Sequence, residues 1–492
     1  KFFLCLFGKP MKEHKIVGNK ELNIWEALIP IIALVSMLAF NVYVFEDDAI
    51  SGSNQFILLM GGAVAALVGY FNKVSLDTML DNVGSNLKSV AGAILILLLV
   101  GSLSAAWLIS GVIPAMIFYG IKLINPAIFL PTAVVISAII SIATGSSWTT
   151  SATIGIALVA IGKAIGLPAG MVAGAVISGA YFGDKMSPLS DTTNLASAMA
   201  GTKLFTHIKY MAYTTVPTII ITLIVFAVLS LTYEVGEVQG TDELLAAISA
   251  KFNITPWLFS VPLLVIVLIV KKVNPVVALL AGTLLGCIAC ILSQPAILSD
   301  FATMHKTAPT YAFLMQSITQ GVAIETSNAS LNDLFSAGGM SGMLGTVWLI
   351  ICAMVFGGIM EAIGALARIS AALLSFATSV FGLFASTVAS CLAINLTASD
   401  QYLAIVVPGK MFEKAYKDKG LAPENLSRTL EDSGTVTSAL IPWNTCGAYQ
   451  SGVLGVGVSE YIGYAVFNYL SPFMTLIFAA FQIKIAQFSK KD

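Results

Sequence analysis

The sequence predicts an all-α polytopic membrane protein that consists of two repeats with opposite orientations in the membrane. Three observations lead to this fold class. Hydrophobic residues make up 57% of the 492 residues and charged residues only 10%, whereas about 25% of the residues in a soluble globular chain are charged. Landmark residues recur at fixed offsets between the two halves of the chain. Short polar segments interrupt the apolar runs at matching places in both halves.

Apolar runs that are long enough to cross a bilayer occur along the whole chain. They include Ile24 to Phe45, Ser89 to Gly111, Tyr210 to Tyr233 and Thr346 to Ile363. A helix of about 20 residues crosses the roughly 30 Å of hydrocarbon in a bilayer, and on this criterion we expect about ten to thirteen membrane segments, which cross the bilayer fully or in part. The sequence lacks the alternating segments of outer-membrane barrels, so helices are expected to satisfy the backbone hydrogen bonds in lipid.

Charge and cysteine patterns exclude several functions. Lys and Arg are scattered through predicted loops and the net charge is −1, so no nucleic-acid partner is indicated. The six cysteines show no metal-binding spacing. No phosphate-binding loop with Gly-Lys-Ser or Gly-Lys-Thr is present, which argues against an ATP-driven pump. We therefore expect neither an enzyme nor a bound cofactor.

The distribution of basic residues orients the chain, because Lys and Arg favour the cytoplasmic side of a membrane. Lys12, Lys15 and Lys20 place the start of the chain in the cytoplasm, and Lys484 and Lys490 place its end there. The predicted divisions are a cytoplasmic tail (1–20), a first transmembrane repeat (21–235), an extracellular linker (236–255), a second transmembrane repeat (256–487) and a second cytoplasmic tail (488–492).

A duplication is visible when the two halves are compared. The recurring pairs are Trp25 and Trp257, Pro30 and Pro262, Gly92 and Gly345, Gly111 and Gly364, Thr144 and Thr397, and Pro188 and Pro442. The loop after Pro188 is basic, whereas the loop after Pro442 is neutral to acidic, and the preceding loops show the opposite bias. This reversal predicts an inverted-topology repeat, in which discontinuous helices from both halves hold the substrate near the middle of the membrane.

Four polar segments mark the predicted substrate site. Residues 144–151 correspond to residues 397–401, and residues 183–194 correspond to residues 431–445. Gly and Pro loosen a helix and free backbone carbonyls, while Asp, Ser, Thr and Asn add side-chain oxygens that can replace the hydration shell of Na⁺. A carboxylate removed from bulk water can hold either a proton or a sodium ion near neutral pH, because burial raises its pKa. Competition at one carboxylate is sufficient for antiport.

The candidate ion-binding residues are Thr144, Ser146, Ser147, Asp184, Ser187, Asp191, Thr192, Asn194, Thr397, Ser399, Asp400, Asp432, Asn444 and Thr445. Asp191 and Asp400 are the main candidates for Na⁺, since acids within the membrane are costly and usually functional.

Structural roles remain open for some of these residues. Ser and Thr in membrane helices also bond their own backbone or serve in packing. Asp184 and Asp432 could instead pair with Lys185 or lie at the cytoplasmic edge. Glu361 is a candidate proton relay, and an interfacial pair with Arg368 is the alternative.

The chain resembles the NhaC-type sodium/proton antiporter family. The resemblance lies in residues 144–150, 183–194 and 338–343, in Phe356 to Gly358 and in Glu361. It implies Na⁺/H⁺ exchange at a bacterial cytoplasmic membrane and a fold of the broad ion transporter superfamily, with re-entrant hairpins and inverted repeats. Some members of this family resemble malate/lactate exchangers that couple organic anions to H⁺ and Na⁺.

Two substrate classes therefore stay open. The chain has only two arginines, Arg368 and Arg428, and both are predicted to be cytoplasmic. The most direct ligand for an organic carboxylate is Arg, so this distribution favours a cation. The N-termini of broken helices can bind a carboxylate without Arg, so Na⁺/H⁺-coupled transport of an organic anion or an amino acid is the alternative. A channel is less compatible with duplicated broken helices. A homodimer is also compatible with the sequence.

Overall fold

A computed structural model of the chain describes residues 22–45, 52–123, 125–233, 241–271, 273–302, 308–326, 332 and 334–488. The predicted N-terminal tail (1–20) lies outside these residues, and so does most of the predicted C-terminal tail (488–492). The predicted linker (236–255) is described from residue 241, where a helix begins.

Helices account for nearly all of the described secondary structure. The first half contains α1 (Ile24–Phe45), α2 (Ser53–Phe71), α3 (Leu76–Ile109), α4 (Val112–Leu123), η2 (Pro126–Ile128), α5 (Phe129–Thr144), α6 (Ser147–Thr150), the π-helix η3 (Ser151–Gly155), α7 (Ile156–Ala164), α8 (Ala169–Met186), α9 (Asp191–Ala200) and α10 (Leu204–Thr232).

The second half begins with a helical connection. It contains α11 (Thr241–Lys251), η4 (Pro256–Phe259), α12 (Ser260–Val270), α13 (Pro275–Ser293), α14 (Pro295–Ala302), α15 (Pro309–Gln320), β1 (Val322–Ala323), β2 (Ser336–Ala337), α17 (Gly339–Gly342), α18 (Leu344–Ala362), α19 (Ala365–Leu374), α20 (Val380–Thr397), α21 (Gln401–Asp418), α22 (Pro423–Leu430), the π-helix η5 (Glu431–Thr435), η6 (Ser438–Leu440), α23 (Thr445–Leu454), α24 (Val458–Tyr461) and α25 (Val466–Ala480). The antiparallel β1–β2 pair joins Val322 to Ala337.

Seven described helices are long and apolar enough to cross a membrane, and an eighth span results if the pair 243–251 and 256–270, bent by 83°, is counted as one. These helices make the chain a multi-pass helical membrane protein. The predicted ten to thirteen segments include part-crossings, and α4, α5, α19 and α25 are apolar helices of only 10–17 residues. The four apolar runs named from the sequence correspond to the continuous helices α1, α3, α10 and α18.

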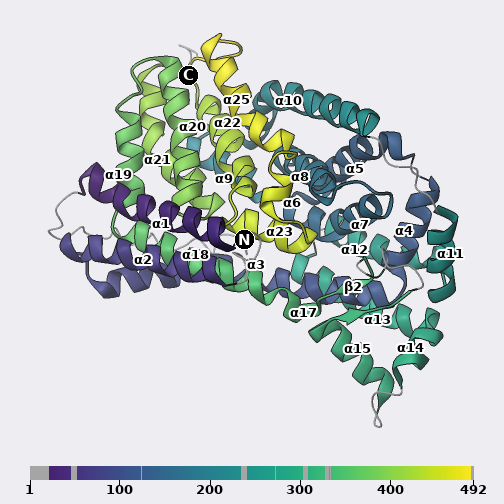
Figure 1. Cartoon of the computed structure of the whole chain (residues 1–492). Coiled ribbons are helices and arrows are strands. Elements are labelled where there is room, and N and C mark those ends of the chain that lie inside the picture. Colours follow the sequence, from purple (N-terminus) through teal and green to yellow (C-terminus); the bar gives the residue numbers. More distant parts are fainter. Residues whose placement is uncertain are drawn as a thin grey trace.

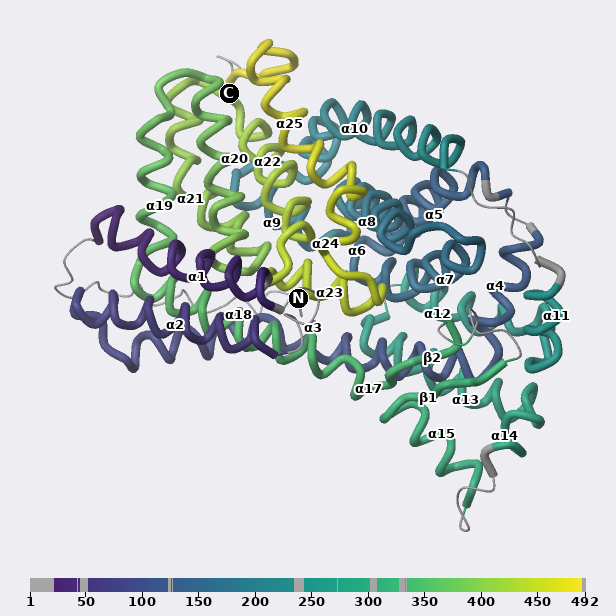
Figure 2. The backbone as a smooth tube through the Cα atoms, in the orientation of Figure 1, coloured from purple at the N-terminus to yellow at the C-terminus, as the bar shows by residue number. Residues whose placement is uncertain are grey.

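The helices form a layer of long helices and a larger helical body (Figure 1). In the layer, α2 and α3 pack on α18, α1 packs on α2, and α3 also packs on α13. In the body, α5 packs on α8, α21 on α9 and α20, and α25 on α8 and α10. Figure 2 shows that segments distant in sequence, such as α1 and α19, lie side by side.

Glycines set the close packing of α5 on α8. A Cβ atom at Gly179 would meet the backbone carbonyl of Val134, and a Cβ atom at Gly183 would meet that of Ala138. Small residues let membrane helices approach each other closely, because lipid provides no hydrophobic driving force for helix association. This packing brings Asp184, the residue after Gly183, to the start of α6.

Residues 410–428 carry five basic residues and are mostly helical. Helix α21 ends at Asp418 and α22 begins at Pro423, so residues 419–422 alone connect them. Arg428 is fully buried in α22. Its guanidinium group faces the rings of Tyr210 and Phe384, which lie in other helices and make cation–π contacts with it. Its three nitrogens have no hydrogen-bond partner among the described residues.

Candidate ion-binding site

A polar cavity of about 720 Å³ lies where the layer of long helices meets the helical body. Residues 89–96 of α3 and the turn between α12 and α13 form one part of its wall. The rest of the wall comes from the four chain breaks before α6, α9, α21 and α23, which the sequence marked as polar segments. The fold thus brings segments from both halves of the chain to one cavity.

The first break, between α5 and α6, ends in a capped helix start. Gly145 adopts a left-handed backbone (φ 69°) that ends α5. The Ser146 side chain then accepts a hydrogen bond from the Thr149 backbone amide at 3.2 Å. From α8, Asp184 accepts hydrogen bonds from both the backbone amide (3.0 Å) and the hydroxyl (2.7 Å) of Ser147. The Asp184 carboxylate therefore lies at the positive end of the helix dipole of the continuous helical stretch formed by α6, η3 and α7.

The break between α8 and α9 contributes a second helix start. Ser190 caps α9 by accepting a hydrogen bond from the backbone amide of Thr193 at 3.3 Å. Asp191 is the first residue of α9, and its side chain lines the cavity in an exposed position. The Thr192 hydroxyl lies 3.1 Å from the Ser190 hydroxyl and also lines the cavity. Asp191 is thus the most accessible of the carboxylates.

The second half contributes two further helix starts. Asp400 caps α21, since its Oδ1 accepts hydrogen bonds from the backbone amides of Tyr402 (2.8 Å) and Leu403 (3.0 Å). Asn444 caps α23. Ser399 has a left-handed backbone (φ 59°), and its carbonyl accepts a hydrogen bond from the Thr445 amide at 2.9 Å. This bond joins the two breaks of the second half.

The cavity is strongly acidic. Asp184, Asp191 and Asp400 line it, and no lysine or arginine is among its described lining residues. Four helix N-termini partly offset this negative charge, because each carries about half a positive elementary charge. The cavity therefore suits a cation that is coordinated by oxygen atoms, and the same carboxylates can take up protons.

The structure brings half of the sequence-predicted residues to the cavity. These are Thr144, Ser146, Asp184, Asp191, Thr192, Asp400 and Thr445. The other predicted residues, except Asp432, support the breaks. Ser147 donates to Asp184, the Ser187 hydroxyl to the Ile142 carbonyl, the Asn194 amide to the Pro188 carbonyl and the Thr397 hydroxyl to the Ala393 carbonyl, while Ser399 and Asn444 hold the second-half breaks as described above.

Asp432 lies away from the cavity. Its carboxylate forms an ion pair with Lys185, and both side chains are fully buried. Asp432 also accepts hydrogen bonds from the hydroxyls of Thr214 (2.8 Å) and Thr475. Lys185 Nζ donates a further hydrogen bond to the Ser471 hydroxyl at 3.1 Å. The pairing with Lys185 that the sequence left open is therefore present for Asp432, and this pair connects α8, η5, α10 and α25.

Glu361 is half-buried in α18 and does not line the cavity. With its amide oriented to donate, Asn86 reaches Glu361 Oε2 at 3.2 Å. No ion pair joins Glu361 to Arg368 in the described part of the chain. Asp400 and Lys410 are the charged groups that act on its carboxylate.

Sequence reasoning missed an aromatic stack between the halves. The rings of Trp148 and Tyr449 lie parallel with centroids 4.0 Å apart, and the Tyr449 hydroxyl donates to the Trp148 carbonyl at 3.1 Å. Trp148 belongs to a predicted polar segment, but Tyr449 lies in α23 without any distinguishing pattern around it. Repeat comparison alone could not pair the two.

Broken helices from both halves that surround an acidic cavity in a multi-pass helical protein define a secondary transporter. The model of the Na⁺/H⁺ antiporter family matches residues 179–483. The chain is 36% identical to the Na⁺/H⁺ antiporter NhaC of Alkalihalophilus pseudofirmus over 86% of this chain and 89% of that protein. The chain belongs to the NhaC family of Na⁺/H⁺ antiporters, which confirms the family resemblance seen in the sequence.

Other relatives show that substrates differ among similar proteins. The malate-2H⁺/Na⁺-lactate antiporter of Bacillus subtilis is 34% identical over 93% of both chains. The arginine/ornithine antiporter ArcD of Halobacterium salinarum is 34% identical over 95% of this chain and 94% of that protein. Among solved structures, Neisseria gonorrhoeae MtrF aligns over 94% of this chain and 96% of its own, with 15% identity and a TM-score of 0.35.

Proposed function

We propose that this protein exchanges Na⁺ for H⁺ across the membrane by alternating access, with both ions competing for the carboxylates of the polar cavity. The main support for this proposal is the acidic lining of the cavity. Asp184, Asp191 and Asp400 line it, and no lysine or arginine is among its described lining residues. Family membership supports the same function.

The geometry suggests how the two ions compete. Asp184 and Asp400 are buried, and helix-start amides already hold one oxygen of each. A carboxylate that faces the membrane interior is costly unless a cation or a proton neutralises it. Na⁺ would bind the remaining carboxylate oxygens together with hydroxyls such as those of Thr144 and Thr192, and protonation of the carboxylates would release it. A cavity that holds neither Na⁺ nor protons on its carboxylates is disfavoured, so the release of one ion requires the binding of the other. This requirement couples the Na⁺ flux to the H⁺ flux.

Matching caps support a duplication of the chain. Ser146 and Asp400 cap α6 and α21, and Ser190 and Asn444 cap α9 and α23; in each pair the two residues are 254 positions apart. This offset agrees with the one between Pro188 and Pro442 in the sequence. We extend the proposal to a first repeat at 21–235, a second at 256–487, both termini in the cytoplasm and residence in a bacterial cytoplasmic membrane.

An organic substrate is the second candidate. The cavity, at about 720 Å³, is much larger than a dehydrated sodium ion requires. Helix N-termini at its wall could hold a carboxylate group. One relative is named as a malate/lactate antiporter and another as an arginine/ornithine antiporter. In this reading, Na⁺ or H⁺ drives the exchange of a small organic anion or an amino acid.

Variants at the carboxylates test the proposed function. We expect Asp191→Asn and Asp400→Asn to abolish Na⁺-dependent proton movement in proteoliposomes while the purified protein keeps its expression level and elution volume. Glu413→Gln, on the exposed side of α21, is the matched control and should transport normally. Unchanged transport in both Asp variants would remove these residues from the site.

A further inference from the structure

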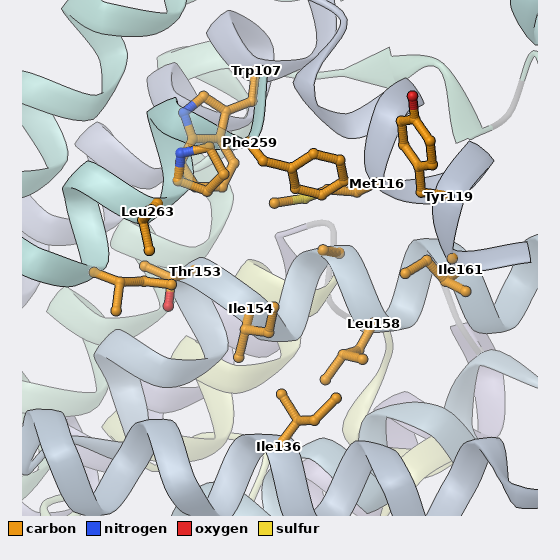
Figure 3. A pocket seen from close by; sticks show the side chains of 14 residues that line it. Trp107, Met116, Tyr119, Ile136, Thr153, Ile154, Leu158, Ile161, Phe259 and Leu263 are labelled. Carbon is orange, nitrogen blue, oxygen red and sulfur yellow. The ribbon is translucent and has the colours of Figure 1, made fainter. Parts of the chain in front are cut away.

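A second cavity, of about 390 Å³, lies apart from the polar one and has an almost entirely apolar wall. Its walls come from α4, from Ile136 of α5, from η3 and α7, and from η4 and α12, with Trp107 of α3 at one end (Figure 3). Figure 3 shows Tyr119 and Ile161 at the opposite end. None of the acidic residues of the polar cavity lines it.

The wall determines the kind of occupant. An apolar cavity does not hold ordered water, because water needs polar partners there. An empty cavity of this size would leave its lining atoms without van der Waals contacts. On α12, Leu263 lines the cavity and is 60% exposed, so the rim opens toward the hydrocarbon that surrounds a membrane protein. A hydrocarbon chain from the bilayer is therefore the occupant that fits.

Two lysines lie beyond one end of this cavity. Gly120 of α4 and Ile161 of α7 both line it and lie close together, since a Cβ atom added at Gly120 would lie 2.7 Å from Ile161 Cδ1. Lys122 and Lys163 follow two residues later, at the ends of the same two helices, and both are exposed. Neither forms an ion pair within the described residues. Positive charge at the end of an apolar slot matches a lipid with an anionic headgroup.

We propose that this cavity is a binding site for an anionic phospholipid, with one acyl chain between α4, α7 and α12 and the phosphate near Lys122 and Lys163. The hydrophobic effect does not drive this binding, because the chain leaves one apolar environment for another. Shape complementarity with a preformed wall and attraction between headgroup and lysines provide the selectivity.

This site would act on transport through one continuous stretch of helix. Thr153 and Ile154 of the π-helix η3 line the apolar cavity, and Trp148 and Thr149, one turn earlier, line the polar one. π-helical turns are uncommon and occur frequently at functional sites. A bound acyl chain restricts the position of η3 and α7, and a change in its occupancy would alter how readily the start of α6 moves during exchange.

Lipid retention in nanodiscs tests the site directly. The full-length protein is reconstituted with equal amounts of phosphatidylglycerol and phosphatidylethanolamine, and the lipids that stay bound are quantified by native mass spectrometry. We expect the unmodified protein to retain phosphatidylglycerol preferentially. Replacing both lysines (Lys122→Gln with Lys163→Gln) should lower that preference by about fivefold for each lysine. Lys414→Gln with Lys417→Gln, two exposed lysines on α21, is the matched control and should keep the preference.

A second variant tests the acyl-chain slot. Ala157→Phe places a ring into the cavity and should remove the retained lipid, whatever its headgroup. The proposal is overturned if the double-lysine variant and the control retain the same lipids, or if the retained lipid survives in a folded Ala157→Phe protein. Retention of detergent or of a second copy of the chain in place of phospholipid also overturns it. None of these outcomes depends on which ion is transported.

Discussion

Replacing Asp432 by Asn should destabilise the protein strongly. Lys185 and Asp432 are both fully buried, so the variant leaves the lysine without its counter-ion. Removing one partner of a buried ion pair costs about 3–5 kcal/mol, because the remaining charge is buried without compensation. A change of 1 kcal/mol shifts the melting temperature by about 2–4 °C in a domain of 150–250 residues, and by about half as much in a chain twice that size. We therefore expect a decrease of about 3–10 °C.

The chain offers a matched control in its exposed pair. Lys251 Nζ and Asp300 Oδ2 lie 2.9 Å apart, and the two side chains are 30% and 53% exposed. Exposed pairs contribute about 0–1 kcal/mol, so Asp300→Asn should leave the melting temperature nearly unchanged. The melting temperatures of both variants are measured with purified proteins in one detergent. After heating to each temperature, size-exclusion chromatography shows how much folded protein remains.

A paired substitution separates a structural role from ion binding. Combining Lys185→Met with Asp432→Leu removes both charges and should recover most of the lost stability, because apolar replacements of buried pairs are often neutral or stabilising. The reasoning is refuted if Asp432→Asn melts like the unmodified protein but binds Na⁺ more weakly. In that case Asp432 is an ion ligand, as the sequence suggested, rather than a connection between α8, η5 and α25.

Three further variants or conditions test the polar cavity. Gly201→Ala should lower the free energy of unfolding by about 1–2 kcal/mol, because a left-handed backbone disfavours a side chain and there is open space around this residue. Gly145→Ala should lower it by more than this control in thermal unfolding, since its backbone is also left-handed and the added Cβ would lie 2.7 Å from the Leu189 carbonyl carbon. Tyr449→Phe removes one hydrogen bond to Trp148 but keeps the stacked rings, so it should lower the free energy of unfolding by about 1 kcal/mol and retain exchange. Tyr449→Ala removes the stack as well and should slow exchange severely in transport assays. Equal exchange rates in both variants would contradict a role for the stack. Lowering the pH on the Na⁺-loading side should raise the apparent KM for Na⁺ by up to about tenfold per pH unit, since protons occupy the same carboxylates; a KM independent of pH in flux measurements would contradict competition.

The composition and the polar segments made the helical membrane fold and half of the candidate site predictable. Asp191 and Asp400 stand out because carboxylates rarely occur within apolar stretches, and the cavity indeed contains both. Segment length located the continuous helices α1, α3, α10 and α18, but composition does not reveal where a backbone turns back. The left-handed backbone at Ser399 is such a case, since serine gives no signal for it.

Partnerships across the two halves could not be derived from a single sequence. Lys185 lies beside Asp184 in the chain, yet it pairs with Asp432, because successive residues of a helix point in different directions. Arg428 lies in a charged stretch that reads as a cytoplasmic loop, but aromatic rings from distant helices bury it. Charge counting does not detect such packing, since the covering residues are remote in sequence.

Sodium flux driven by a proton gradient tests the central claim most directly. Purified protein in proteoliposomes with an acidic interior should take up radioactive sodium, and a variant with Asp184, Asp191 and Asp400 all replaced by Asn should not. The same vesicles are tested with malate, lactate, arginine and ornithine. If the pH gradient drives no sodium uptake in the unmodified protein but does drive exchange of one of these organic compounds, Na⁺/H⁺ exchange is not its function.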